Sequence, residues 1–359
     1  MVAWPQELLE AFVEQIRGKK TLQQCSLASK SLVVACQRRL FHTVSVMEMT
    51  DCHRATQHFT AFPHLRSYVR ALHATVQPDG QAEWEELASL LPMFPNMARL
   101  DWTAGIQWPN VLISALRESL QSPSLQSFNL LVANKFPPSL LSHAAASVSQ
   151  LGLWHVTLDD RAERAVGVVP RPNLKSLTHR VASKMGNQDT IRLLLPHLSG
   201  LEKLEDDLTS ASQSKLIMEA SHRSLKKLSL PDLDIPKLAH IPRTLRMDSL
   251  LVLHVGFVWR ASPEHCLISL FRELPPPSCM PQLETLSVRI GPADKVPVHA
   301  HNASGLGPIL DSHTRLRAFE VELRWSLPPD DGTFPLAEYI QAQTPTRIRV
   351  TISNRKDKE

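Results

Sequence analysis

The chain has 359 residues, a formal net charge of +4 and 43% apolar residues. This small charge, without a dense Lys/Arg stripe interleaved with aromatic residues, argues against nucleic acid as a partner. No apolar run approaches the roughly 20 residues that span a bilayer, and acidic residues within the first 17 positions are unlike a signal peptide. The five cysteines are an odd number without CxxC spacing, as expected in a reducing compartment. We therefore expect a soluble cytoplasmic or nuclear protein.

The apolar residues of positions 1–46 follow helical spacing. The members of one stripe are Leu8, Leu9, Phe12, Val13 and Ile16. Pro5 suits the first turn of this helix, because a missing N–H has no partner to lose there. Gly18 is expected to end the helix, and Thr21 to cap a second one. Such a small helical unit is near the size at which a lone core becomes marginal, so we expect it to pack on a neighbour or a partner.

Three segments of this region resemble a known domain. They read Trp4-Pro5-Gln6-Glu7-Leu8-Leu9, Cys25-Ser26-Leu27-Ala28-Ser29-Lys30-Ser31-Leu32 and Arg39-Leu40-Phe41-His42-Thr43-Val44. Together they resemble the F-box, in the versions that large families of mushroom-forming fungi join to irregular leucine-rich repeats. The family usually has Leu before the Pro, where this chain has Trp4, and often Trp at the place of Leu32.

The resemblance implies a docking role for these helices. In the family the F-box binds a Skp-type adaptor of a cullin ubiquitin ligase. The matching positions of this chain are Pro5, Leu8, Leu9, Ile16, Cys25 and Leu27. Each buried aliphatic anchor contributes about 1.5–3 kcal/mol before the cost of association is subtracted. The alternative is that the same residues only form an internal three-helix core.

Residues 47–95 show a weaker pattern. Positions 65–76 are compatible with a first, imperfect strand, so we expect this segment to couple the helical domain to the rest of the chain. It also contains a group of potential metal ligands whose spacing matches no standard zinc pattern, and we predict no metal there. The group consists of Cys52, His53, His58 and His64.

From Met97 to Val321 a six-residue phrase recurs, with apolar residues at the first and fourth positions and usually at the sixth. We call it the repeat phrase. The nine copies are Met97–Trp102, Leu125–Leu130, Leu151–Val156, Leu174–His179, Leu201–Asp206, Leu225–Leu230, Leu250–Val255, Leu283–Val288 and Leu316–Val321. The first six intervals between copies lie within the roughly 20–29 residues expected of leucine-rich repeats, and the last two leave room for inserted loops.

The fifth position of the phrase is polar in all nine copies, as expected of strands with one buried and one solvated face. The sixth position is polar at His179 and Asp206, so we expect short strands or distorted repeats there. Corresponding residues of adjacent parallel strands lie about 4.8 Å apart and form a continuous surface. We predict that this surface binds a client protein, and its predicted members are His155, Lys203, Glu205, Lys227 and His254.

Towards the C-terminus, residues 347–352 alternate like a closing edge strand, and the mostly charged positions 354–359 are predicted to be disordered. Positions 291–308 are rich in Pro and Gly and predict an exposed loop, with His299 and His301 solvated. The expected fold is α/β, with a small N-terminal helical F-box followed by a curved leucine-rich-repeat solenoid of parallel strands. Its expected parts are an F-box-like domain (1–46), a coupling segment with a degenerate first repeat (47–95), the solenoid (96–330), and a C-terminal cap with a disordered tail (331–359).

None of the common motifs of active sites occurs, including GxSxG, GxxxxGK[ST], HExxH and GxGxxG. We therefore predict no catalytic residue, cofactor or metal. The resulting hypothesis is a substrate receptor of a Skp-cullin-F-box ubiquitin ligase, monomeric within its complex, which binds a Skp-type adaptor and a client protein. One alternative is an interaction scaffold that retains the F-box fold without adaptor affinity. Another is an enzyme or ligand-binding protein with a pocket at the loop of residues 291–308.

Overall fold

The computed structural model describes residues 5–75, 78, 80–103, 107–159, 173–180, 188–208, 211–233, 241, 244–257, 270, 273–290, 306–325, 340–342 and 344–356. The chain divides into two compact units, an N-terminal unit of residues 1–169 and a C-terminal unit of residues 170–359. Both are α/β units with parallel strands, and the strands are arranged in solenoid-like order. None of the helices in the described ranges is long and apolar enough to cross a membrane.

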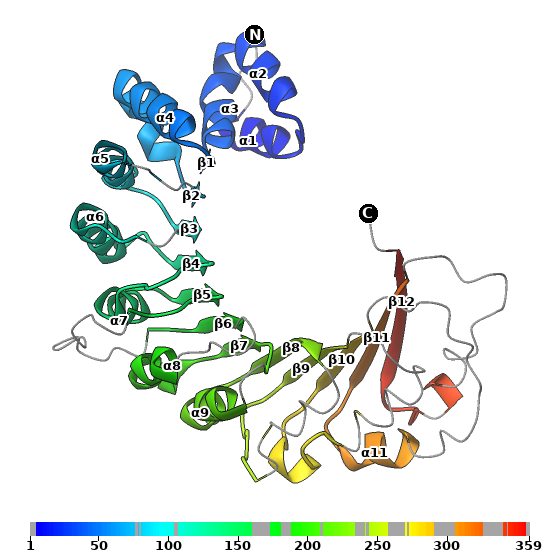
Figure 1. Cartoon of the computed structure of the whole chain (residues 1–359). Coiled ribbons are helices and arrows are strands. Elements are labelled where there is room, and N and C mark those ends of the chain that lie inside the picture. The colour runs from blue at the N-terminus through cyan, green and yellow to red at the C-terminus, as the bar shows by residue number, and fades with distance from the viewer. Residues whose placement is uncertain are drawn as a thin grey trace. The chain divides into compact units, whose positions relative to one another are not determined.

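The N-terminal unit begins with three helices and continues with alternating strands and helices (Figure 1). Its helices are α1 (Gln6–Glu14), α2 (Lys19–Ala28), α3 (Val33–Leu40), α4 (Met49–Ala61), α5 (Gln81–Leu90), α6 (Asn110–Gln121) and α7 (Pro138–Ser147), with 3-10 turns at Lys30–Leu32, Pro63–Tyr68 and Leu91–Met93. Its strands are β1 (Thr43–Val46), β2 (Ala71–Ala74), β3 (Arg99–Thr103), β4 (Ser127–Leu131) and β5 (Gln150–Trp154).

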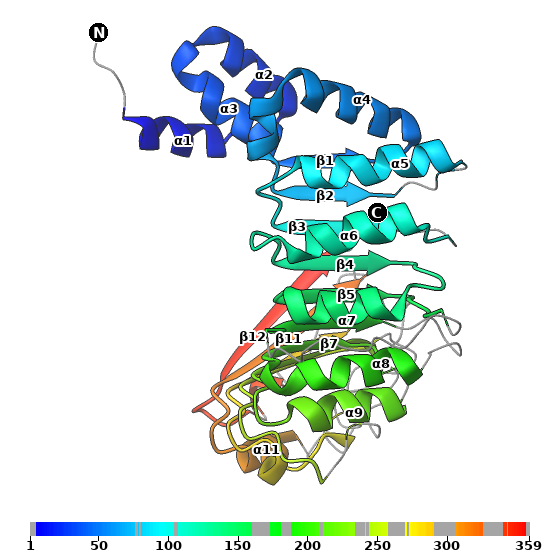
Figure 2. The same ribbon diagram turned by 90° about the vertical axis from the view of Figure 1, so that its left-hand side faces the viewer.

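These five strands pair in chain order, each parallel to the next. Helices α5, α6 and α7 cover one face of the sheet, whereas its other face carries none of the helices that the structure describes (Figures 1 and 2). The repeat phrase explains this arrangement, since its first, fourth and sixth residues point toward the helices. In the repeat of β4 these residues are Leu125, which precedes the strand, and Phe128 and Leu130 within it, all buried. Burying each such side chain contributes about 1.5–3 kcal/mol, so every repeat adds its own layer of core.

The C-terminal unit contains the strands β6 (Ser176–Arg180), β7 (Lys203–Asp206), β8 (Lys227–Leu233), β9 (Val252–Phe257), β10 (Thr285–Ile290), β11 (Ala318–Trp325) and β12 (Arg349–Lys356). They also pair in parallel and in chain order. The helices are α8 (Gln188–Leu194), α9 (Ala211–Ser221) and α11 (Leu306–Ser312), with 3-10 turns at Leu195–Gly200 and Pro277–Cys279. As in the N-terminal unit, these helices lie on one face of the sheet (Figure 1).

The sheet begins earlier in the chain than the sequence indicated. Strand β1 lies within the segment predicted as a helical domain, and β2 lies within the predicted coupling segment, beside the unpredicted helices α4 and α5. The imperfect strand expected over residues 65–76 is a 3-10 turn followed by β2. The apolar phrase is inconspicuous here because the inward-facing Ala74 is small. The boundary at residue 96 therefore cuts through a continuous parallel sheet.

The phrase predicted at Leu151–Val156 is out of register by three residues. The observed pairing places Leu151 opposite Phe128 and Gly152 opposite Asn129, so Leu151 occupies the fourth position rather than the first. The true first residue is Val148, which is buried. Consequently His155 lies beyond the end of β5, with a φ of 55°, and does not belong to the row of fifth positions.

The observed ends of several helices and strands also differ from the predicted ones. Helix α1 ends at Glu14, and α2 begins before Thr21, with Gly18 as its N-cap residue. Strand β12 confirms the predicted closing strand but continues to Lys356, so the first part of the predicted disordered tail is a paired strand. Of the loop predicted over residues 291–308, positions 306–308 begin α11. Positions 4, 266, 291–305 and 357–359 lie outside the described residues.

Candidate functional site

The three N-terminal helices have a small core of their own. Val13, Leu22, Ala35 and Cys36 are buried in it. Ile16 and Cys25, two of the six residues predicted to bind an adaptor, pack against this core, as does Leu32. These residues therefore stabilise the helical unit itself, as the internal-core alternative required for some of them.

Several other apolar side chains of these helices face solvent. Leu27 on α2 is 87% exposed, and Leu8 on α1 is 52% exposed. Phe12, one turn after Leu8, is 56% exposed although it was not among the predicted adaptor contacts. Pro5 is exposed and Leu9 is partly buried. Exposed apolar side chains that the internal core does not use are available for contact with a partner. We call Leu8, Phe12 and Leu27 the exposed apolar set.

The same region is strongly basic. No acidic residue occurs between Glu14 and Glu48. Among the cations of this stretch, Arg17, Lys19, Lys20 and Lys30 are exposed and have no ion-pair partner among the described residues. The segment from Arg17 to Lys30 thus combines the exposed Leu27 with positive charge that no ion pair of the described residues compensates, which favours an acidic partner.

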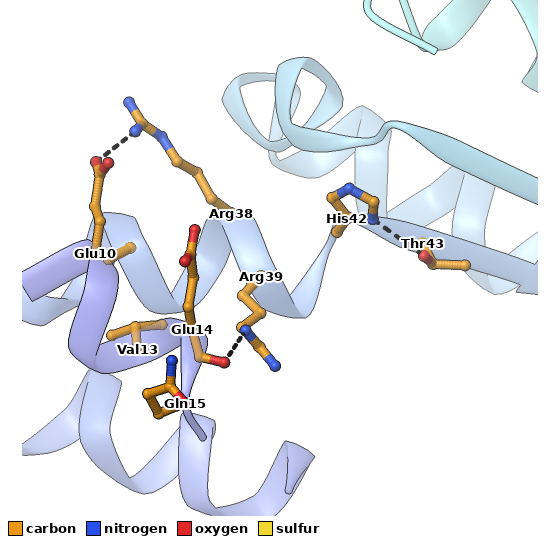
Figure 3. Close-up of a pocket in the computed structure, with 9 residues that line it drawn as sticks. Glu10, Val13, Glu14, Gln15, Arg38, Arg39, His42 and Thr43 are labelled. Atoms are coloured by element: carbon orange, nitrogen blue, oxygen red, sulfur yellow. Dashed lines mark hydrogen bonds and ion pairs between the residues drawn. The ribbon is translucent and has the colours of Figure 1, made fainter. Parts of the chain in front are cut away.

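A groove of about 690 Å³ lies between α1, α3 and the start of β1 (Figure 3). Its lining residues are Glu10, Val13, Glu14, Gln15, Ala35, Arg38, Arg39, His42 and Thr43. Arg38 forms an ion pair with Glu10 at 2.7 Å, and Arg39 donates to the backbone oxygen of Glu14 at 2.5 Å. These contacts join α1 to α3 across the groove. The groove was not predicted, because its residues are far apart in the repeat-free part of the sequence.

The free face of the C-terminal sheet carries the predicted client-binding residues, with the exception of His155. Lys203 and Lys227 are register neighbours on β7 and β8. Glu205 and His254 belong to one adjacent row, with Ser229 between them. Glu205 accepts a hydrogen bond at 2.7 Å from Arg180 of β6. The structure thus brings four of the five predicted residues onto one mixed-charge surface.

His254 has a perturbed environment. Its partial burial lowers the pKa of the imidazole below the ordinary value of 6.5, and the nearby positive charges of Lys227 and Arg289 lower it further, against the opposing effect of Glu320. His254 therefore remains a neutral donor and acceptor at a pH where an exposed histidine is partly charged.

The free face of the N-terminal sheet holds a polar network that the sequence analysis missed. Asp101 on β3 is only 7% exposed. Its carboxylate lies 2.6 Å from Nδ1 of His73 on β2, and accepts hydrogen bonds from Arg99 Nε at 2.8 Å and from Asn129 Nδ2 on β4 at 2.6 Å. The sequence could have indicated this network, because His73, Asp101 and Asn129 occupy successive fifth positions of the repeat phrase. It was missed because β2 was not recognised as a full repeat.

These partners stabilise the ionised form of the Asp101 carboxyl group. Burial alone would raise the pKa of its carboxyl group, but the hydrogen bonds from Arg99 and Asn129 and the charges of Arg99 and His73 outweigh burial and leave the pKa below 3.8.

Next to this network, the ring of Trp154 lies over Gly152. A Cβ atom at position 152 would come within 2.1 Å of that ring and 2.3 Å of Asn129 Oδ1. The N-terminal free face thus presents fixed polar groups beside an indole ring.

These surfaces supply charges, hydrogen-bonding groups and an aromatic ring in fixed positions, which suits the recognition of another macromolecule. In the described ranges, no group of three or more His, Cys, Asp or Glu side chains is arranged to hold a metal ion. His58, from the group considered as metal ligands, instead stacks on Phe41 with ring centroids 5.3 Å apart.

A comparison with protein-family models and a comparison with curated proteins both gave no match. Among solved structures, the chain is similar to a crystal structure of a Bacteroides fragilis protein determined by a structural genomics consortium. The two share 12% sequence identity over 98% of this chain and 72% of the other, with a TM-score of 0.25.

Proposed function

We propose that the chain is the substrate-recognition subunit of a Skp-cullin-F-box ubiquitin ligase, with an F-box-like helical region followed by irregular leucine-rich repeats. The helices bind a Skp-type adaptor, and the free faces of the parallel sheets bind a client protein. The chain itself is non-catalytic and acts in the cytoplasm or nucleus. Holding a client beside the transfer machinery raises its effective concentration there.

The observation that carries this proposal is the exposed apolar set on helices that already have an internal core. Leu8, Phe12 and Leu27 each have more than half of their surface in solvent. Burial of such side chains by a partner contributes about 1.5–3 kcal/mol each, less the cost of association. Because Ile16 and Cys25 are partly used inside the unit, the contact surface centres on these three residues rather than on all six predicted ones.

The test is binding of the full chain to a purified Skp-type adaptor, measured by isothermal titration calorimetry. Leu27→Asp places a charge at the most exposed apolar position, and we expect it to weaken binding by about tenfold or more, equivalent to about 1.4 kcal/mol. Since Leu27 is 87% exposed, the stability of the chain should be unchanged. Binding should also weaken with added salt, as the positive charge of the segment from Arg17 to Lys30 requires.

Met47→Asp is the matched control, because Met47 is 58% exposed but follows β1 rather than lying on α1 or α2. This variant should bind the adaptor like the native chain. Absence of binding by the intact chain would exclude the ligase role, and equal binding by Leu27→Asp would place the contact elsewhere.

A second function, an interaction scaffold without adaptor affinity, is favoured by one specific observation. Two of the six residues matched to the adaptor contacts pack against the internal core, which leaves fewer anchors than the family pattern implies. For this alternative, replacing Trp4 by Leu and Leu32 by Trp should create adaptor binding that the native chain lacks.

A further inference from the structure

Strand β1 is the first strand of the N-terminal sheet, and among the described residues it pairs only with β2. The backbone oxygen of His42 accepts from the N–H of Ala71 at 3.0 Å, and that of Val46 accepts from the N–H of Thr75 at 2.9 Å. In a parallel strand, the N–H and C=O of alternate residues point to the same side. Residues 42, 44 and 46 therefore face β2, whereas Thr43 and Ser45 face the outer edge.

The outer edge of β1 is open at these two residues. Among the hydrogen bonds of the described residues, none engages the backbone groups of Thr43 or Ser45 on this side, and both residues are exposed. The next outward N–H, that of Met47, donates to the carboxylate of Asp51 at 3.2 Å. The unpaired stretch is thus short and well defined, with two donors and two acceptors at strand spacing.

The groove between α1 and α3 adjoins this edge. His42 and Thr43 form its boundary toward β1, as Figure 3 shows. Val13 and Ala35 also line it, but only 2% and 4% of their surfaces are exposed, so most of its wall comes from polar side chains. The rim carries charges of both signs, with Arg38 paired to Glu10 and Arg39 held by the backbone of Glu14. A neutral side chain is therefore better matched to this groove than a charged one, which would meet a like charge on one wall.

We propose that the outer edge of β1 and the adjoining groove bind an extended segment of another polypeptide. The segment adds to the sheet as a further strand through the backbone of Thr43 and Ser45, and one of its neutral side chains enters the groove. The spacing of the free groups selects the occupant, because an extended main chain supplies acceptors and donors at alternate residues in this geometry. Side chains on either side of that main chain then provide sequence preference. This recognition is independent of adaptor docking by the exposed apolar set.

The test begins with selection of short displayed peptides of random sequence on the immobilised full chain, followed by fluorescence anisotropy of the selected peptides. Ser45→Pro removes the outward N–H but leaves the ladder to β2, which uses residues 44 and 46. We expect this variant to bind the peptides about tenfold or more weakly. Ser45→Ala is the matched control, since it removes only the hydroxyl group and should bind like the native chain.

A second measurement uses the native chain alone, so it tests strand addition even if Ser45→Pro folds poorly. N-methylation of one peptide residue at a time removes single backbone donors. For strand addition, the loss of affinity should recur at alternate residues, because alternate N–H groups face β1. Equal binding by Ser45→Pro and Ser45→Ala, or an N-methylation profile without alternation, would overturn the proposal. So would a selection without binding peptides, or sedimentation data in which a second copy of the chain occupies the edge.

Discussion

His179 and Asp206 show how two polar residues can occupy a position that elsewhere belongs to the core. Both stand at the sixth position of the repeat phrase, on β6 and β7, as register neighbours. They are 4% and 0% exposed, with His179 Nδ1 3.5 Å from Asp206 Oδ1. Asp206 Oδ1 also accepts from the N–H of Leu208 at 3.0 Å, while Asp206 Oδ2 and His179 Nδ1 have no hydrogen-bond partner among the described residues. Burying such groups is costly unless each compensates the other.

The pair should therefore be strongly coupled. We expect His179→Leu to destabilise the native chain by about 3–5 kcal/mol, because it leaves a buried carboxylate without its neighbour. In the background of Asp206→Leu, the same change should cost less than about 1 kcal/mol or stabilise the chain, since both positions then match the apolar phrase. Urea unfolding of the native chain, both single variants and the double variant measures the coupling. An equal cost of His179→Leu in both backgrounds would show that the two residues act independently.

At the scale of elements, β12 closes the C-terminal sheet against β11 over eight paired residues. Arg349 donates its N–H to the backbone oxygen of Arg317 at 2.8 Å, so by alternation Thr351 and Ser353 also face β11. The intervening residues, including Asn354, face the outer edge. The strand thus has one edge of its backbone in the ladder, while no hydrogen bond between described residues engages the other edge.

Proline substitutions distinguish these two sides. Ser353→Pro removes a ladder hydrogen bond to β11 and should lower the free energy of unfolding by about 1–3 kcal/mol. Asn354→Pro, the adjacent control, removes only an outward N–H and should cost clearly less. The two variants can be compared by urea unfolding followed by circular dichroism. If Asn354→Pro proved the more damaging of the two, the assigned direction of the ladder would be wrong.

The sequence allowed most of the parallel strands to be predicted, because large apolar residues at the first and fourth positions of the phrase mark each buried layer. The prediction failed where this apolar pattern was ambiguous. Leu151 satisfies either the first or the fourth position, and only the pairing with Phe128 decides. Polar His179 suggested a shortened strand, yet β6 has five residues, because the backbone ladder does not depend on an apolar sixth side chain.

The candidate sites were less predictable than the strands. The Asp101 network depends on β2, whose small Ala74 hides its repeat phrase. The division of the adaptor-matched residues into exposed Leu27 and core-packed Cys25 depends on how α2 packs. The open edge of β1 follows from pairing, which no local pattern of residues specifies. The spacing of apolar residues predicted where most strands lie, whereas tertiary contacts determine which side chains remain available for binding.

At the scale of the whole molecule, three partly or largely buried histidines make stability depend on pH. Burial lowers the pKa of His143, His254 and His313 below 6.5, with added contributions from Arg117 at His143 and Lys227 at His254. The unfolded chain takes up protons at these residues below its ordinary histidine pKa, while the folded chain resists uptake. Acidification through this range therefore favours unfolding.

We expect the free energy of unfolding to fall between about pH 7 and about pH 5.5. The lowered pKa of Asp101 does not contribute here, because that carboxylate loses its stabilising charge only below 3.8. His254→Gln cannot take up the proton and should make the decline shallower. Urea midpoints of both chains at the two pH values test this. A native midpoint that is equal or higher in acid would contradict the expectation.

Helix α3 ends at Leu40 and β1 begins at Thr43, so only Phe41 and His42 separate the helical region from its sheet. Phe41 stacks on His58 of α4, and the guanidinium carbon of Arg38 lies 6.0 Å from the centre of the Tyr68 ring. This junction has no flexible tether. A protein that binds the first helices is consequently held in a fixed orientation relative to β1–β5. The orientation in which a ligand of those strands faces that protein is therefore set by the chain itself.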